Sequence, residues 1–150
     1  MTEAYHYTES GLNDIYLANG FEMNAGRLRI HDIEGLHRAI GRWLVSTRKQ
    51  LSGGEIRFLR HELELSQVTL STLLGVTERT VIRWERDREN RDIGNPSAER
   101  TLRLLYMEKE FGNSDVSGSL ERIANLEDRI NQPVEFSYCD DNEWHENMAA

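Results

Sequence analysis

The sequence predicts an α+β protein: a small N-terminal antiparallel β-meander with a helix, a compact all-helical domain, and a C-terminal helix with a short β-hairpin. Two observations support this fold class. Up to residue 31, short apolar runs alternate with glycine-containing turns, whereas from residue 32 to 111 apolar residues recur at helical spacing. We expect three segments, at residues 1–50, 51–111 and 112–150.

Composition places the chain among globular proteins. Its 150 residues, 38% of them hydrophobic, suffice for one compact domain or two small ones. No apolar run approaches the ~20 residues of a membrane-spanning helix, and the first ten residues lack the features of a signal peptide. The single cysteine, Cys139, excludes an intramolecular disulfide and a cysteine-based zinc cluster. We expect a cytoplasmic protein without membrane contact, metal or cofactor.

The net charge of −8 by itself argues against nucleic-acid binding. The distribution of charge along the chain changes this conclusion. Lys and Arg number six against six Asp and Glu in residues 1–54, ten against eleven in 55–111, and two against nine in 112–150. The middle segment has a local arginine density that suits phosphate contact, formed by Arg79, Arg83, Arg86, Arg88 and Arg91. Because acidic residues interleave with these arginines, a solvated, salt-bridged helix end explains the charges equally well.

Short strands are expected before residue 32. Asn19-Gly20 separates residues 15–18 from 21–23 and is a strong hairpin signal, because both central positions of a type I′ turn need a positive φ. Asn24-Ala25-Gly26 offers a second turn before a strand at residues 27–31. The alternative is that the first two strands are one, which passes through Asn19-Gly20 at a bulge.

Two capped helices follow. Asp32 is a good N-cap for a helix that runs to about Lys49, and its apolar positions are Ile33, Leu36, Ile40, Trp43 and Leu44. Ser52 and Glu55 fit a capping box, in which each side chain accepts from the backbone N–H of the other residue. The helix that they open reaches about Leu63. Gly53-Gly54 is not a phosphate-binding loop, because no Lys-Ser/Thr follows.

Residues 65–86 predict two short helices joined by a tight turn at Gly75. Ser66 and Thr77 are suited to cap the two helix starts, because a hydroxyl oxygen can accept from the N–H groups of the first turn. Both helices have an apolar face, formed by Leu70, Leu73 and Leu74 on the first and by Val81 and Trp84 on the second. This helix-turn-helix is the geometry that places a helix in the DNA major groove.

The remaining elements lie beyond the arginine-rich stretch. Asn95-Pro96 predicts a cap, with proline at the first position of a helix that runs to about Phe111. Residues 112–119 have the composition of a linker. A last helix over residues 120–130 is expected to end before Pro133. The alternation at residues 134–139 then predicts a strand that turns back at 140–142, and we expect both strands to join the N-terminal meander.

The run FLRHELELSQVTLSTLLGVTERTVIRWER resembles the helix-turn-helix of the XRE/Cro family of phage-type repressors. The matching residues are Leu65-Ser66-Gln67, Leu70, Leu74-Gly75-Val76, Thr77, Val81 and Trp84-Glu85. SAERTLRLLY resembles the closing helix of MqsA-type antitoxins, and residues 5–40 resemble regulators with a short YgiT/MqsA-like N-terminal unit. Such units hold zinc through paired cysteines, which this chain lacks, so no structural zinc is expected.

The second helix of the motif is expected to read bases through its outward positions, which are Glu78, Arg79, Thr80 and Arg83. Arginine contacts guanine O6 and N7, glutamate accepts from cytosine N4, and threonine touches a thymine methyl or a phosphate. The alternative for Glu78 and Arg79 is a surface ion pair. Ile82 either is part-buried or contacts a thymine methyl.

Residues around the base-reading positions are expected to contact phosphate or to form an ion pair within the domain. The resemblance implies that Gln67 contacts backbone phosphate and that Arg60 pairs with Glu85 inside the domain. The other candidate phosphate contacts are Thr69, Thr72, Arg86 and Arg88.

Together these expectations describe a sequence-specific transcriptional regulator, an autoregulatory repressor that binds a palindromic operator in double-stranded DNA as a homodimer. Candidate dimer surfaces are the helix that ends at Phe111, with spare apolar residues such as Leu104, and the helix at residues 120–130. The alternative is the antitoxin of a type II toxin–antitoxin pair, which neutralises a toxin by direct protein binding. An enzyme is not expected, because the sequence shows no nucleophile–base pair, metal-ligand cluster or phosphate loop.

Overall fold

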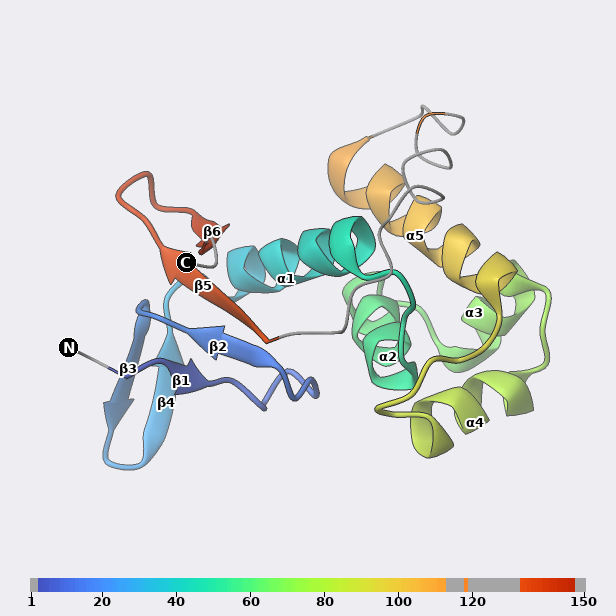
Figure 1. Ribbon diagram of the computed structural model, residues 1–150, viewed down its shortest axis with the longest axis horizontal. Helices are drawn as coiled ribbons and strands as arrows, with labels where there is room; N and C mark the ends of the chain where they lie inside the picture. The colour runs from blue at the N-terminus through green and yellow to red at the C-terminus, as the bar shows by residue number, and fades with distance from the viewer. Residues whose placement is uncertain (1–2, 113–117, 119–132, 148–150) are drawn as a thin grey trace. The chain divides into compact units, whose positions relative to one another are not determined.

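The computed structural model describes residues 3–112, 118 and 133–147 and shows an α+β protein (Figure 1). The elements follow in the order β1 (Tyr5–His6), β2 (Ile15–Leu17), β3 (Phe21–Asn24), β4 (Arg27–Ile30), α1 (Ile33–Thr47), α2 (Gly53–Glu62), α3 (Gln67–Leu74), α4 (Glu78–Asp87), α5 (Pro96–Phe111), β5 (Val134–Tyr138) and β6 (Trp144–Glu146). The α+β class predicted from the sequence is therefore confirmed. The last predicted helix, at residues 120–130, lies outside the described residues.

The chain divides into two compact units, one of residues 1–40 and 131–150 and one of residues 41–130. This division differs from the three segments expected from the sequence. Its boundary falls within α1, and the first unit combines both ends of the chain. The physical reason is that β5 pairs in parallel with β2, with Val134 opposite Ile15, so that the C-terminal strands extend an N-terminal sheet as the sequence predicted.

In the second unit, the helices begin where the sequence predicts. Ser52 and Glu55 form the predicted capping box at the start of α2. Ser66, Thr77 and Asn95 cap α3, α4 and α5, and each side chain accepts from the backbone N–H three residues further on. These caps satisfy donors that a helix start leaves without partners. Local sequence therefore sets the boundaries of the helices that carry the candidate site.

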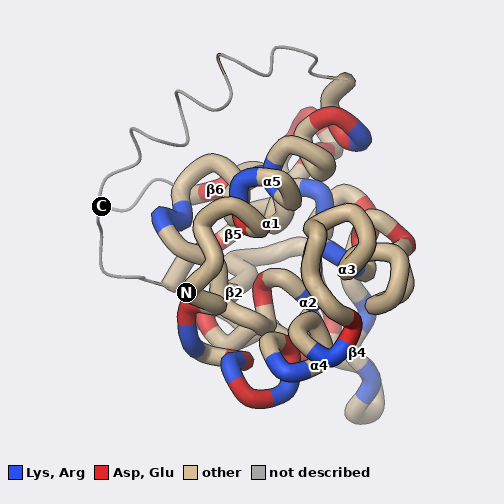
Figure 2. The backbone as a smooth tube through the Cα atoms, turned by 90° about the vertical axis from the view of Figure 1, so that its right-hand side faces the viewer, with Lys and Arg blue, Asp and Glu red and all other residues tan. Residues whose placement is uncertain are grey.

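The start of α2 packs against the end of α4, a helix that carries both basic and acidic residues (Figure 2). The Gly53 N–H donates to the Arg88 carbonyl at 2.8 Å, and the Gly54 N–H donates to the Glu89 carbonyl at 3.0 Å. The unpaired donors of one helix start and the carbonyls after another helix end thus satisfy each other. A Cβ at Gly53 would overlap the carbonyl oxygen of Trp84, so this approach requires glycine.

The core of the second unit is apolar and follows most of the helical spacing predicted from the sequence. Its fully buried side chains include Leu44, Leu51, Ile56, Leu59, Leu70, Val81, Leu102 and Tyr106. The prediction that Leu73 belongs to the inner apolar face is wrong, because its side chain is 47% exposed. The buried positions of α3 are Leu70 and Ser71, and Leu73 lies roughly 110° around the helix from the centre of that face. In the first unit Ile33, also predicted to face inward, is 46% exposed at the start of α1.

A buried arginine closes the C-terminal end of α1. Arg103 of α5 is 1% exposed, and its guanidinium donates to the Val45 carbonyl at 2.9 Å and to the carbonyl of Arg48. A helix leaves its last carbonyls without partners and carries partial negative charge there, so a cation is favourable. Arg48 in turn pairs with Glu55 at 3.1 Å and lies over the Trp43 ring. Charged side chains therefore join α2 and α5 to the end of α1.

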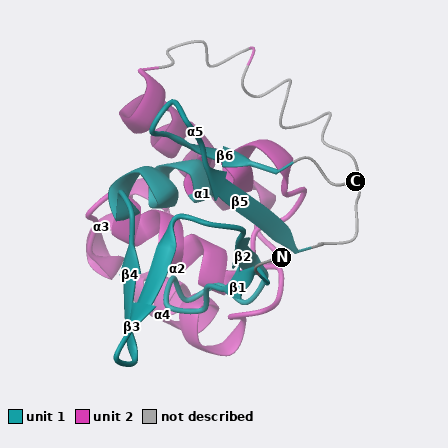
Figure 3. Cartoon of the chain, turned by 90° about the vertical axis from the view of Figure 1, so that its left-hand side faces the viewer, with its two compact units in different colours: residues 1–40, 131–150 teal, residues 41–130 magenta. Residues whose placement is uncertain are grey.

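The first unit, teal in Figure 3, contains two sheets rather than one meander. β3 and β4 form a hairpin through Ala25-Gly26, whose φ angles of 52° and 79° have the sign that a type I′ turn requires. The other sheet has the order β1-β2-β5-β6. The turn predicted at Asn24-Ala25-Gly26 is therefore confirmed, and the single antiparallel meander is wrong.

Asn19-Gly20 fails to form the predicted hairpin because it is held by the far end of the chain. The Asn19 carboxamide accepts from the Tyr138 N–H at 2.6 Å, and a Cβ at Gly20 would press against the Trp144 ring. Trp144 is 6% exposed, and its indole donates to the His31 carbonyl at 2.9 Å. A local turn signal is thus overridden by contacts more than a hundred residues away in sequence.

Glu99 is a carboxylic acid in a buried position at the start of α5. It is 5% exposed and accepts a hydrogen bond from the Leu51 N–H. The pKa of Glu99 is raised from 4.5 to about 7, chiefly by burial and also by the nearby Asp92 and Glu55, against the lowering by the Leu51 N–H and Arg103. The folded protein therefore binds a proton at Glu99 more readily than the unfolded chain does.

Substituting Gly53→Ala is expected to lower the free energy of unfolding by about 1–3 kcal/mol, because the new methyl group overlaps backbone. Gly54→Ala is the comparison variant. Its Cβ would also overlap backbone, 2.8 Å from the Glu89 carbonyl oxygen, but less severely than at Gly53, so its loss of stability should be smaller. Urea unfolding of both variants measures the difference, and equal losses would contradict the close approach described at Gly53.

Glu99 predicts a pH-dependent stability. Since its pKa is higher in the folded state, the free energy of unfolding should fall as pH rises from about 4.5 to about 7. Glu99→Gln keeps an oxygen acceptor without a charge, so it should exceed the wild type in stability above about pH 7 and converge with it below about pH 4.5. Urea titrations across this range test the prediction, with exposed Glu108→Gln on the same helix as the control. A constant offset between Glu99→Gln and wild type would contradict it.

Candidate nucleic-acid interface

The turn between α3 and α4 is built on one left-handed residue. Gly75 ends α3 with φ 71° and ψ 31°, a conformation that glycine adopts without steric cost. The N–H groups of Gly75 and Val76 donate to the carbonyls of Thr72 and Ser71 at 3.3 and 3.0 Å. Thr77 then begins α4. The helix-turn-helix geometry predicted for residues 65–86 is therefore present.

The inner face of α4 is held by apolar packing and by a buried ion pair. Val81 and Trp84, which were predicted to face inward, are 0% and 4% exposed. Next to them, the Glu85 carboxylate accepts from Arg60 of α2 through Nε and Nη2, both at 2.8 Å. Arg60 also donates to the Leu65 carbonyl at 3.0 Å. The pair that the resemblance implied thus joins α2, the segment before α3, and α4.

The outer face of α4 forms a shallow depression, lined by Glu78, Arg79, Ile82, Arg83 and Arg86. These positions lie on one side of a helix because they repeat at intervals of four from Glu78 and from Arg79. Three arginines and one glutamate make this outer face basic although the chain is acidic overall. Among the described residues, no ion pair joins Glu78 to Arg79, in contrast to the surface-pair alternative.

Thr80 lies apart from the other predicted base-reading residues. It is half-buried on the flank of α4, and its hydroxyl shares a 2.8 Å hydrogen bond with the hydroxyl of Thr77. Ile82 and Arg86 take its place on the outer face. The spacing of four residues from Glu78 to Ile82 to Arg86 is the signal in the sequence that would have identified them.

The candidate phosphate contacts on α3 differ in their surroundings. Thr69 and Thr72 are exposed, and the Thr72 hydroxyl donates to the Val68 carbonyl at 3.2 Å. Gln67 is half-buried, and its amide donates to Glu85 at 3.2 Å. The Gln67 side chain therefore supports the buried ion pair, a role that the sequence did not predict.

At the other end of the motif, Arg86 and Arg88 are both exposed. Arg86 makes a two-pronged ion pair with Asp87, at 2.8 and 3.1 Å, and this contact raises the pKa of Arg86 and lowers that of Asp87. Arg88 donates to the Asp92 carbonyl at 3.0 Å. Exposed pairs of this kind contribute little to stability and are easily exchanged for contacts with phosphate.

Comparisons with known proteins identify no relative: the chain matches no protein-family model, no curated protein and no solved structure. In the part of the chain that the structure describes, no helix has the length and apolar character needed to cross a membrane. The candidate interface is therefore defined by the geometry of α2, α3 and α4 alone.

The buried ion pair predicts a large difference between two arginines of α2. Arg60→Met should lower the free energy of unfolding by about 3–5 kcal/mol, because Glu85 would remain buried without its cation. Arg57→Met removes a partly exposed pair with Glu89 and should cost less than about 1 kcal/mol. Chemical denaturation of both variants measures these losses, and similar values would contradict the structural role of Arg60.

Proposed function

We propose that this protein is a sequence-specific DNA-binding transcriptional regulator that inserts α4 into the major groove. The observation that supports this most directly is the outer face of α4 defined above, which is exposed and basic. The opposite face of the same helix is fixed by Val81, Trp84 and the Arg60–Glu85 pair. A rigidly held helix with accessible polar side chains is what base reading requires.

Each side chain of the outer face matches a feature of the groove. Arg79 and Arg83 are one turn apart and exposed, and each guanidinium has the geometry for guanine O6 and N7. Ile82, beside them on the outer face, suits a thymine methyl group, and Glu78 can accept from cytosine N4. Arg86 lies one turn further on, where it contacts either a base edge or a phosphate.

Phosphate contacts position such a helix without reading sequence. Thr69 and Thr72 expose hydroxyl groups on α3, and Arg88 is exposed just after α4. The positive end of the α3 dipole adds to the attraction for a phosphate. Since the Gln67 amide donates to Glu85 and the Thr72 hydroxyl donates to the Val68 carbonyl, Thr69 and the exposed arginines are the better candidates for these contacts.

One α4 spans only a few base pairs, so a single copy would have low specificity. Two copies related by a two-fold axis would read the half-sites of a palindrome whose centres lie about one helical turn apart. We therefore include a homodimer and a palindromic operator in the proposal. Binding upstream of its own gene would make the protein an autoregulatory repressor.

Footprinting on the DNA upstream of the gene tests the proposal. The wild-type protein should protect an inverted repeat. Arg79→Ala and Arg83→Ala should each weaken operator binding by about 5- to 150-fold, because each removes a base contact worth roughly 1–3 kcal/mol.

Arg100→Ala is the matched control, because Arg100 is exposed on α5 and its loss removes the same charge. This variant should bind the operator as the wild type does. Circular dichroism verifies that all variants are folded. Operator binding by Arg83→Ala that equals the wild type, or an equal loss in Arg100→Ala, would rule out α4 as the reading helix.

A further inference from the structure

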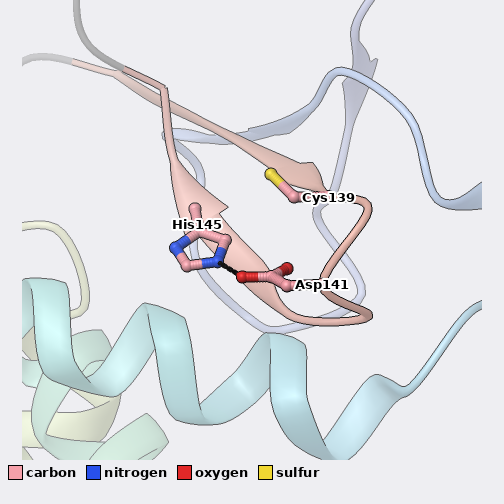
Figure 4. A group of neighbouring side chains, drawn as sticks. All are labelled: Cys139, Asp141 and His145. Atoms are coloured by element: carbon pink, nitrogen blue, oxygen red, sulfur yellow. Dashed lines mark hydrogen bonds and ion pairs between the residues drawn. The ribbon is translucent and has the colours of Figure 1, made fainter.

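The β5–β6 hairpin brings together three side chains of the types that bind transition metals. Cys139 follows the last residue of β5, Asp141 lies in the connecting loop, and His145 is on β6 (Figure 4). The Cys139 Sγ, a carboxylate oxygen of Asp141 and a ring nitrogen of His145 all lie within 4.8 Å of one another. In the described part of the chain, this is the one such group of three.

The pairing of the strands explains this proximity. Ser137 lies opposite His145, and alternate residues of a strand share one face, so Cys139 continues the face of Ser137 and His145. The loop brings Asp141 to the same place: its carboxylate accepts from the Glu143 N–H at 3.0 Å and contacts His145 Nε2 at 2.7 Å. The arrangement therefore follows from backbone register and a tight loop.

The opposite face of the hairpin anchors it. Trp144 is buried against Gly20, and its indole donates to the His31 carbonyl. The Cys139 N–H donates to the Glu143 carbonyl at 2.9 Å and closes the loop. The three candidate ligands thus stand on a preformed support, while their side chains remain accessible.

We propose that this hairpin binds one zinc ion through Cys139 Sγ, the Asp141 carboxylate and His145 Nε2. Thiolate, imidazole and carboxylate together are a zinc donor set, with metal–ligand distances of about 2.0–2.3 Å. Tetrahedral ligation requires side-chain shifts of about one ångström from the present spacing. The carboxylate of Glu143, 4.0 Å from His145 Nε2, is within reach of the fourth position.

This site differs from the paired-cysteine zinc sites of YgiT/MqsA-like units, because it uses one cysteine near the C-terminus. No metal was expected from the sequence, because a single cysteine excludes a cysteine-based zinc cluster. The sequence signal for the present site is the spacing C-x-D-x₃-H, from Cys139 to His145, across a predicted hairpin. Only the register of the two strands shows that the first and last residues share a face.

Titration of the metal-free full-length protein with cobalt(II) tests the proposal. A sulfur-to-cobalt charge-transfer band arises only when a thiolate binds the metal, and Cys139 is the single cysteine of the chain. The band should saturate at one cobalt per chain and disappear when zinc is added. It should be lost in Cys139→Ser, and zinc should raise the thermal midpoint of the wild type but not of this variant.

A pair of neighbouring substitutions separates ligation from general attraction to acidic residues. Asp141→Asn should weaken zinc binding at least ~10-fold in competition with a chelating dye. Asp140→Asn loses the same charge one residue away, outside the cluster, and should bind zinc as the wild type does. Circular dichroism without metal verifies that both variants are folded. Absence of the band, a plateau at half a metal per chain, or equal losses in the two variants would overturn the proposal.

Discussion

The Arg60–Glu85 ion pair is the interaction on which the geometry of the helix-turn-helix depends. Both side chains are at most 10% exposed, and two parallel N–H···O bonds of 2.8 Å join them. Removing two charges from water is costly, and the attraction offsets this cost only when the geometry is good and the remaining donors are satisfied. The Leu65 carbonyl and the Gln67 amide supply those further bonds. One buried pair thus sets the position of α4 relative to both helices before it.

Burial decides what an arginine does in this protein. Arg60 and Arg103 are buried and use several donors of the planar guanidinium to bind a carboxylate or helix-end carbonyls. Arg79 and Arg83 are exposed on the outer face of α4. The same residue type therefore builds the support and supplies the candidate contacts with DNA. Net charge does not distinguish these roles, because most of the acidic excess lies after residue 111.

The helical unit could be predicted from its sequence in most details because its signals are local. Capping hydroxyls act on N–H groups three residues away, and the glycine at position 75 acts on its own backbone. The prediction was wrong where the sequence pattern allowed more than one side of a helix to face the core. Leu73 fits a helical apolar pattern but lies away from the packed face of α3. Periodicity gives the spacing of a face but not its exact direction.

The sequence alone determined the α+β class, the starts of the capped helices, the β3–β4 turn and the helix-turn-helix with its inward Val81 and Trp84. Tertiary structure decided the pairing of β2 with β5, the role of Gln67, the makeup of the outer face of α4, and the meeting of Cys139 with His145. The physical reason is the range of the interactions. Caps and turns are satisfied within a few residues, whereas sheet order and side-chain clusters depend on which distant segments bury their apolar surface together.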